Sequence, residues 1–201
     1  MIKIIKDEDL YNHIGEYDLI LIGTDINCMM SQGFQRKIML NYPYVYSQNM
    51  ETKYGDKGKL GTILECKEEG KPTFVLLYIN SGNHRPDIKP VYVSYESIEK
   101  CMKLINILYK GKNIASTIIG SSKFDGNGDK DKIIEILNNN SDNINLTLYD
   151  YIQKSRAEEL KDVRAKELEL KKKDIDAYYK AVKKRKEEAD ERFKNNGHAR
   201  Y

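Results

Sequence analysis

The stretch Asp18-Leu-Ile-Leu-Ile-Gly23 is the part of the sequence that is most informative about the fold. Four consecutive apolar residues run into a glycine, without the polar alternation of a strand that has one face in water. Such a run is typical of a strand buried on both faces, in a sheet that helices cover on either side. Residues 114–119, Ile-Ala-Ser-Thr-Ile-Ile, form a second run of this kind.

The segments around these two runs alternate between strand and helix patterns. Further strands are predicted over residues 2–6, 60–66, 73–79 and 144–149, with the second and third of these paired through the turn at 68–71. Helices are predicted over 33–42, where Pro43 ends the helix, over 94–109, capped by Ser94, and from Asp129 or Asp131 to Leu137. This order predicts an α/β domain with a mixed, mostly parallel sheet between helices.

After Tyr151 the composition changes sharply. Residues 154–194 contain no Gly or Pro and are more than half charged, which predicts one long solvated helix. Apolar residues recur there every seven positions, at Leu168, Ile175, Val182 and Ala189, but the complementary positions are charged. The pattern favours a single helix or a weak self-association seam over a committed coiled coil. We therefore predict two parts, a globular domain over 1–152 and a charged helical extension over 153–201.

Composition restricts the setting and the partners. Residues 154–201 hold 16 Lys/Arg and 11 Asp/Glu, so of the net charge of +3 the extension carries +5 and the rest −2. The interleaved acids weaken its field, so nucleic-acid binding is not expected. No run of 18 apolar residues and no secretory pattern is present, and the three cysteines fit neither a disulfide framework nor a metal site. These features predict a cytoplasmic, reducing setting without membrane attachment.

Two loops follow apolar strands and run into predicted helices, at residues 23–33 and 120–129. Ligands of α/β sheets bind beyond the carboxyl ends of strands, where helix N-termini offer backbone N–H groups to anions. A diphosphate held between two such helix starts is physically reasonable, although glycine loops of this kind are also common as plain turns.

An ordered set of short motifs resembles macro domains, nearest the branch of the terminal ADP-ribose protein glycohydrolase and the ADP-ribose 1″-phosphate phosphatases. The first two motifs are Ile5 to Leu10, which resembles the family's turn whose acid contacts adenine, and Met30-Ser31-Gln32-Gly33-Phe34, which resembles its phosphate loop. The next two are Lys59-Leu60-Gly61-Thr62-Ile63, which resembles the family's strand entry, and Lys89-Pro90-Val91-Tyr92, which precedes a long helix. The last two are Gly126-Asn127-Gly128-Asp129, which resembles the second ligand loop, and Thr147-Leu148-Tyr149, which resembles the last strand.

The resemblance implies a macro-type fold that binds ADP-ribose or a related nucleotide without a metal or other cofactor. The ligand-binding residues it implies are Asp9, Leu10, Thr24, Asn27, Met30, Ser31, Gln32, Gly33, Phe34, Gly120, Ser121, Ser122, Gly126, Asn127 and Gly128.

Catalytic residues follow from the resemblance as well. In the glycohydrolase branch a lysine attacks the ribose anomeric carbon and an aspartate of the second loop handles protons, which places Lys59 and Asp129 in these roles, with Asp125 as a rival. The alternatives are a surface lysine at Lys59 and a helix N-cap at Asp129.

The sequence also departs from its hydrolytic relatives. Gly23-Thr24-Asp25-Ile26-Asn27 replaces their Asn-Ala-Ala-Asn strand end, and the Gly-Gly-Gly loop is missing. These departures favour binding over turnover. Three functions therefore stay open: hydrolysis of an ADP-ribosyl bond or a 1″-phosphate, a non-catalytic nucleotide reader or sponge, and a structural module whose charged helix recruits a protein partner or mediates assembly.

Overall fold

The computed structural model describes residues 2–82, 92–122 and 125–151, and the isolated residues 172, 180 and 183. The chain divides into two units, Met1–Gln153 and Lys154–Tyr201, and the sheet with its covering helices lies in the first unit. The helix predicted over 154–194 lies outside the described residues except at those three positions. The Lys89-Pro90-Val91 part of the fourth motif lies outside them entirely.

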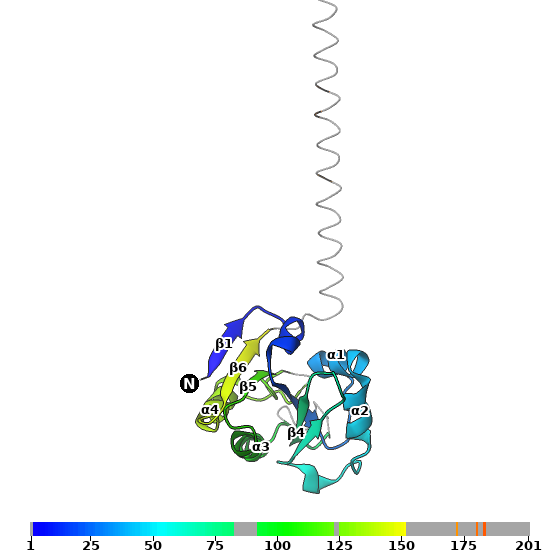
Figure 1. Cartoon of the computed structure of the whole chain (residues 1–201), viewed down its shortest axis with the longest axis vertical. Helices are drawn as coiled ribbons and strands as arrows, with labels where there is room; N and C mark the ends of the chain where they lie inside the picture. The colour runs from blue at the N-terminus through cyan, green and yellow to red at the C-terminus, as the bar shows by residue number, and fades with distance from the viewer. Residues whose placement is uncertain are drawn as a thin grey trace, which may run out of the picture. The chain divides into compact units, whose positions relative to one another are not determined.

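A six-stranded sheet forms the centre of the first unit (Figure 1). Its strands are β1 (Lys3–Lys6), β2 (Leu19–Asp25), β3 (Ile63–Cys66), β4 (Phe74–Asn80), β5 (Asn113–Thr117) and β6 (Asn145–Asp150). They lie in the order β1-β6-β5-β2-β4-β3, and every neighbouring pair is parallel except β3 and β4. The mixed, mostly parallel sheet predicted from the sequence is thus confirmed.

The central strands explain the uninterrupted apolar runs. β2 lies between β5 and β4, with Ile20 opposite Ala115 on one side and Phe74 on the other. All seven residues of β4 and the first six of β2 are buried. Because both faces of these strands are covered, neither face requires polar residues.

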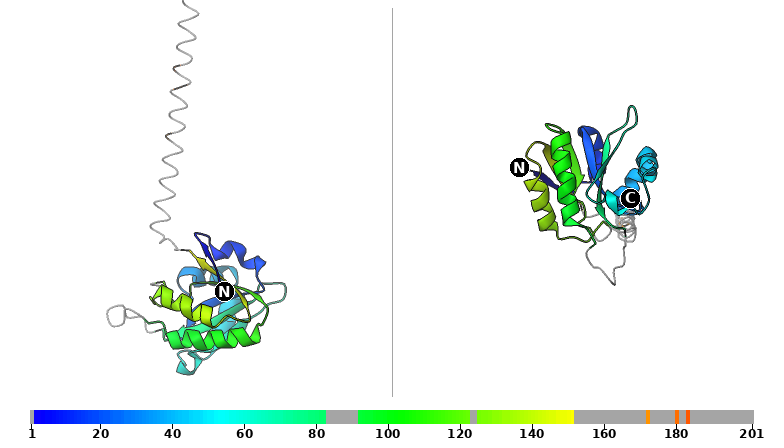
Figure 2. Two further views of the ribbon diagram at one scale, coloured as in Figure 1. Left: turned by 90° about the vertical axis from the view of Figure 1, so that its left-hand side faces the viewer. Right: turned by 90° about the horizontal axis from the view of Figure 1, so that it is seen from below.

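Helices cover both faces of the sheet. They are α1 (Gly33–Asn41), α2 (Pro43–Met50), α3 (Tyr95–Leu108) and α4 (Lys130–Asn139), with short 3-10 helices η1 (Leu10–Glu16) and η2 (Lys57–Lys59). The right-hand view of Figure 2 shows α3 and α4 on one face and α1 and α2 on the other. Each face has its own core. The core beneath α3 and α4 includes Leu21, Leu77, Ile98, Ile105 and Ile133, and the core beneath α1, α2 and η1 includes Leu10, Ile22, Ile38, Val45 and Leu76.

Helix boundaries follow local signals at most positions. The Ser94 hydroxyl accepts a hydrogen bond from the Ser97 N–H and caps α3, as predicted. Pro43 does end α1, but it also begins α2, a helix that the sequence did not predict. Proline is favoured in the first helical turn because its missing N–H would have no partner there. The short helix η1 was not predicted either.

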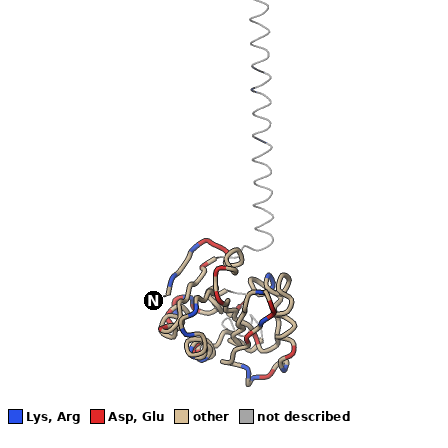
Figure 3. The backbone as a smooth tube through the Cα atoms, in the orientation of Figure 1, with Lys and Arg blue, Asp and Glu red and all other residues tan. Residues whose placement is uncertain are grey.

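Charged residues are interspersed along the chain of this unit (Figure 3). Several form ion pairs across exposed surface, as Lys103 does with Glu99 and Lys100 with Glu96. Exposed pairs of this kind contribute little to stability. No helix among the described residues is long and apolar enough to cross a membrane.

Candidate functional site

The carboxyl ends of the five parallel strands meet at one edge of the sheet, and the loops that follow them form the candidate site. Because β3 is antiparallel to β4, the segment before β3 reaches the same edge: the Gly61 N–H donates to the Tyr78 carbonyl oxygen at 2.9 Å. Segments that are far apart in sequence therefore meet at this edge, and ligands of α/β sheets usually bind beyond the carboxyl ends of the strands.

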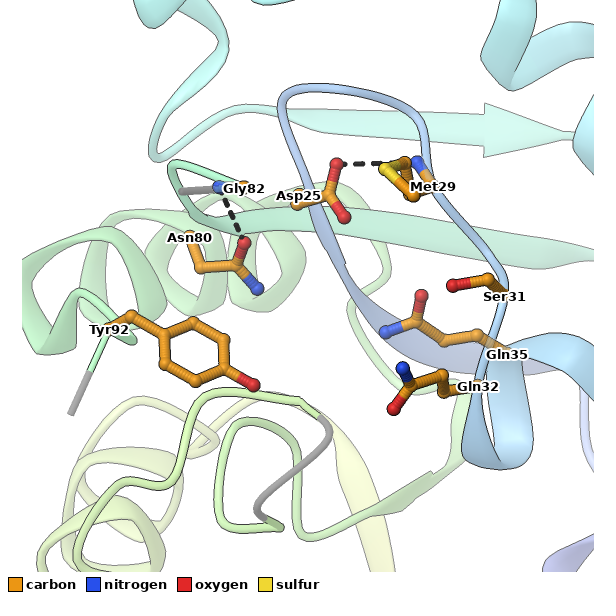
Figure 4. A pocket seen from close by; sticks show the side chains of 8 residues that line it. All are labelled: Asp25, Met29, Ser31, Gln32, Gln35, Asn80, Gly82 and Tyr92. Atoms are coloured by element: carbon orange, nitrogen blue, oxygen red, sulfur yellow. Dashed lines mark hydrogen bonds between the residues drawn. The ribbon is translucent and has the colours of Figure 1, made fainter. Parts of the chain in front are cut away.

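A pocket of about 110 Å³ lies at this edge between the ends of β2 and β4 and the start of α1 (Figure 4). Its lining residues are Asp25, Met29, Ser31, Gln32, Gln35, Asn80, Gly82 and Tyr92. Among these eight residues Asp25 carries the single formal charge, and amide and hydroxyl groups supply most of the rest of the polar surface.

The Asp25 carboxylate is fixed by the backbone of the loop that follows it. Its Oδ1 accepts hydrogen bonds from the N–H groups of Asn27 at 2.7 Å and Met29 at 3.3 Å. Burial raises the pKa of Asp25, and these two hydrogen bonds and the positive charge of Lys59 counteract part of that rise. The loop thus presents a fixed carboxylate to the pocket.

A second carboxylate, that of Asp125, lies behind Gln35. Its Oδ1 accepts from Gln35 Nε2 at 2.9 Å and its Oδ2 from the Gly120 N–H at 2.6 Å. Burial raises the pKa of Asp125 to about 7, and the two hydrogen bonds oppose the rise. A carboxyl group with such a pKa exchanges a proton near neutral pH, as a general acid or base requires.

The start of α1 faces the pocket with Gln32 and Gln35. Gln32 is the N-cap residue, but its side chain makes no capping hydrogen bond. The first-turn N–H groups have no partner inside the helix and remain available to an anion. Of the predicted phosphate loop, Ser31 and Gln32 line the pocket, whereas Met30 is buried in the core and Phe34 packs against it.

The glycines of the second predicted loop have a packing explanation. A Cβ at Gly126 or Gly128 would lie 2.6 Å from a side-chain atom of Val93, and one at Gly120 would lie 2.7 Å from another. The loop is also closed on itself, since the Ser122 carbonyl oxygen accepts from the N–H groups of Asp125, Gly126 and Asn127. None of the predicted ligand residues in this loop, Gly120, Ser121, Ser122, Gly126, Asn127 or Gly128, lines the pocket.

Lys59 lies at the correct edge of the sheet but not in the pocket lining. Its Nζ donates to Thr52 Oγ1 at 2.9 Å and to Cys28 Sγ at 3.2 Å, and it lies 4.6 Å from the centre of the Tyr78 ring. These contacts hold the amine beneath the loop that carries Asp25. Lys59 therefore acts on the pocket mainly through its charge.

Asp129 caps α4. Its Oδ1 accepts from the Lys132 N–H at 2.9 Å, and its own N–H donates to the Tyr95 hydroxyl at 2.8 Å. Asp129 is exposed and does not line the pocket. The geometry thus matches the helix-cap interpretation of this residue.

Asp9 lies near the other end of the same edge, after β1. Its Oδ1 accepts from the Tyr11 N–H at 3.0 Å and caps η1, and its Oδ2 accepts from Lys37 Nζ on α1 at 2.5 Å. Leu10 beside it is buried. Any ligand amine that Asp9 binds must share this carboxylate with Lys37.

Two further predicted residues contribute to the frame of the site. Thr24 is fully buried, and its Oγ1 has no hydrogen-bond partner among the described residues. Asn27 lies against the backbone of Gly82, where a Cβ would come within 2.2 Å of its Nδ2. A side chain at Gly82 would be strained, because the φ of this residue is +69° and Asn27 fills the space beside it.

The sequence interpretation missed most of the residues that line the pocket. Asp25, Gln35, Asn80 and Gly82 were not proposed as site residues, and Tyr92 was noted only as the end of the fourth motif. A signal was present, because Asn80 ends the buried strand β4 in the same way as Asp25 ends β2, and Gly82 lies in the loop after β4. The rule that ligands bind at strand carboxyl ends was applied to two loops and applies equally to the third.

No group of three or more His, Cys, Asp or Glu side chains among the described residues could hold a metal ion. The three cysteines are buried and free.

The sequence matches no protein-family model, and no curated protein matches it. Solved structures do match: a protein of unknown function from Bacteroides thetaiotaomicron is 17% identical, with a TM-score of 0.61, over 75% of this chain and 98% of the other.

Two further solved structures match the same part of the chain. The macrodomain of Thermus aquaticus DarG is 12% identical, with a TM-score of 0.56, over 75% of this chain and 98% of that one. Thermosipho africanus DarTG in complex with ADP-ribose is 13% identical, with a TM-score of 0.59, over 76% of this chain and 43% of that one. At these identities the likeness establishes the macrodomain-like fold.

Proposed function

We propose that this protein binds ADP-ribose or an ADP-ribose-derived nucleotide in a cleft along the carboxyl edge of the sheet. The observation that carries the proposal is the pocket itself, in which Ser31, Gln32 and Gln35 at an N-terminus without a side-chain cap face the ends of β2 and β4. Helix N–H groups suit a diphosphate, and the polar pocket beside them suits a sugar.

The spacing of the edge fits a long ligand. Asp9 follows β1 and the pocket lies at β2 and β4, which are three and four strand positions away. At ~4.8 Å per strand this is a span of roughly 14–19 Å. A nucleotide with two sugars joined by a diphosphate would place its adenine near Asp9 and its distal ribose in the pocket.

Calorimetric titration of the full chain with ADP-ribose tests the proposal, with Gln32→Glu as the informative variant. Gln32 is exposed, so the substitution leaves the core intact, but it adds a negative charge where the diphosphate would lie. We expect it to weaken binding by about tenfold or more. The matched control is Asn139→Asp, which adds the same charge at an exposed position on α4 and should leave affinity unchanged.

Absence of both heat and thermal shift with millimolar ADP-ribose would reject the proposal. Equal affinities of the wild type and Gln32→Glu for ADP-ribose would indicate that the ligand does not bind at the start of α1.

Hydrolysis of an ADP-ribosyl bond is a second candidate, favoured by the pKa of about 7 at Asp125, whose carboxylate is bound to the pocket residue Gln35. In this hypothesis Asp125 exchanges the proton, and Lys59 is the nucleophile that the resemblance implies. Turnover of ADP-ribosylated protein by the wild type, lost in Asp125→Asn while ADP-ribose still binds, would support it. If the wild type shows no turnover, the protein would be a non-catalytic reader of ADP-ribose.

Trapping with borohydride then tests the lysine separately. A reduced ribose adduct at Lys59 supports the nucleophile assignment, and turnover without such an adduct contradicts it.

A further inference from the structure

Two pocket side chains, Asp25 and Gln35, each present an oxygen that can accept a hydrogen bond. Gln35 uses its Nε2 to donate to Asp125, so its Oε1 is left for the pocket, with no partner among the described residues. Asp25 uses Oδ1 for the two loop N–H groups, and its Oδ2 likewise has no hydrogen-bond partner there. Figure 4 shows both side chains around one open space.

The Asn80 amide, which also lines the pocket, is held by two hydrogen bonds within the protein. Asn80 Nδ2 donates to the Asp125 carbonyl oxygen at 3.3 Å, and its Oδ1 accepts from the Gly82 N–H at 3.0 Å. Asn80 is 5% exposed and is held in this orientation from both ends. One N–H of this amide is used in that way, and the free oxygens of Asp25 and Gln35 would accept hydrogen bonds from donors on a ligand.

We propose that Asp25 makes this pocket selective for an uncharged or cationic, hydrogen-bond-donating group at the distal end of an ADP-ribose-type ligand, and that it rejects an anionic group such as a 1″-phosphate. The inference rests on the proposed function, since it concerns the same site. This selectivity would distinguish two classes of substrate that the fold alone does not distinguish: glycosides of the distal ribose and the phosphate ester of that ribose.

The charges around Asp25 support this selectivity. Lys59 lies near Asp25, but its amine is engaged with Thr52 and Cys28 and does not line the pocket. Asp125, with a pKa of about 7, is only partly ionised at neutral pH and adds partial negative charge behind Gln35. A phosphate in the pocket would meet the Asp25 carboxylate directly at low solvent exposure, where repulsion between like charges is strong. Ribose hydroxyls would instead donate to it in charge-assisted hydrogen bonds.

The test compares ADP-ribose, ADP-ribose 1″-phosphate and AMP by calorimetry on the full chain, in the wild type and in Asp25→Asn. The asparagine keeps an oxygen for the Asn27 and Met29 N–H groups and removes the charge. We expect the wild type to prefer ADP-ribose over its 1″-phosphate by about tenfold or more. The variant should lose most of this preference. AMP lacks the distal ribose, so its affinity should not change.

The matched control is Asp142→Asn, the same substitution at an exposed position, which should keep the wild-type preference. Should Asp25→Asn fail to fold, the wild-type comparison still decides, because equal or tighter binding of the 1″-phosphate overturns the inference while leaving the proposed function intact. A preference that survives unchanged in a folded Asp25→Asn also overturns it. A wild type that binds neither ADP-ribose nor its phosphate overturns the proposed function, and this inference with it.

Discussion

At the scale of single residues, Asp125 has the most consequential environment in the domain. Its two oxygens accept from Gly120 and Gln35, and burial raises its pKa to about 7. The folded state therefore binds a proton more tightly than the unfolded chain, in which an aspartate has a pKa of about 3.9. The stability linked to this proton is complete below pH ~4 and is lost as the pH rises through about 7.

We predict that Asp125→Asn flattens the dependence of stability on pH. Between pH 5 and 8 the wild type should lose on the order of 2 kcal/mol of unfolding free energy from this residue. The variant should not lose that increment, since asparagine does not titrate and the Gln35 amide can reverse to match it. Urea unfolding at several pH values measures the difference. Parallel curves for the two proteins would show that Asp125 ionises at little cost in the folded state.

The sequence located Asp125 but did not locate its partners. Asp125 was proposed as a rival to Asp129 for the proton-handling aspartate that the resemblance implies, on the basis of a motif local to the chain. Gln35 lies 90 positions away, and it reaches Asp125 because α1 begins beside the loop that follows β5. Asp25 was missed for a related reason: its place in the pocket depends on the fold of residues 26–29 behind it. Local patterns carry little information about such contacts.

At the scale of elements, buried strands were the most predictable part of the fold. β2 and β4 are covered on both faces, so their apolar runs have one structural explanation. α2 was harder to predict, because Pro43 is a strong stop signal for α1 and its place in the first turn of α2 cannot be told from sequence spacing alone. In that helix Tyr44 and Val45 are buried and much of the rest contacts solvent.

The two roles considered for Asp129 can be separated by mutation. Capping α4 requires only a hydrogen-bond acceptor, whereas proton transfer requires a carboxyl group. Asp129→Ala should cost about 0.5–2 kcal/mol of stability through the lost cap of α4. Asp129→Ser should restore most of that loss, because a hydroxyl also accepts from the Lys132 N–H. Thermal melts report the stability, and titration with ADP-ribose should give similar affinities for all three proteins. If serine restored stability but any turnover stayed lost, the residue would have a chemical role beyond the cap.

At the scale of the whole molecule, the chain separates into units of opposite charge. Residues 154–201 carry +5 and the rest −2. Every residue that lines the pocket belongs to the first unit. The boundary falls after Gln153, close to the change of composition after Tyr151.

We predict that a chain ending at residue 153 folds and binds ADP-ribose with the affinity of the full chain. All six strands and both cores lie before this point, so the truncation removes no described core residue. Circular dichroism and calorimetry compare the two chains. A truncated protein that melts at the same temperature but binds tenfold more weakly would indicate that residues 154–201 complete the site.

The pairing of β1 with β6 has a consequence for synthesis of the protein. Of the six strands, β1 leaves the ribosome first and β6, its neighbour in the sheet, leaves it last, with Lys3 opposite Thr147 and Lys6 opposite Asp150. Until about residue 150 has emerged, β1 has no neighbour and β5 is an open sheet edge. Incomplete chains that end before Asn145 would expose that apolar edge, so stalled or prematurely terminated products should aggregate or be degraded while the finished chain does not.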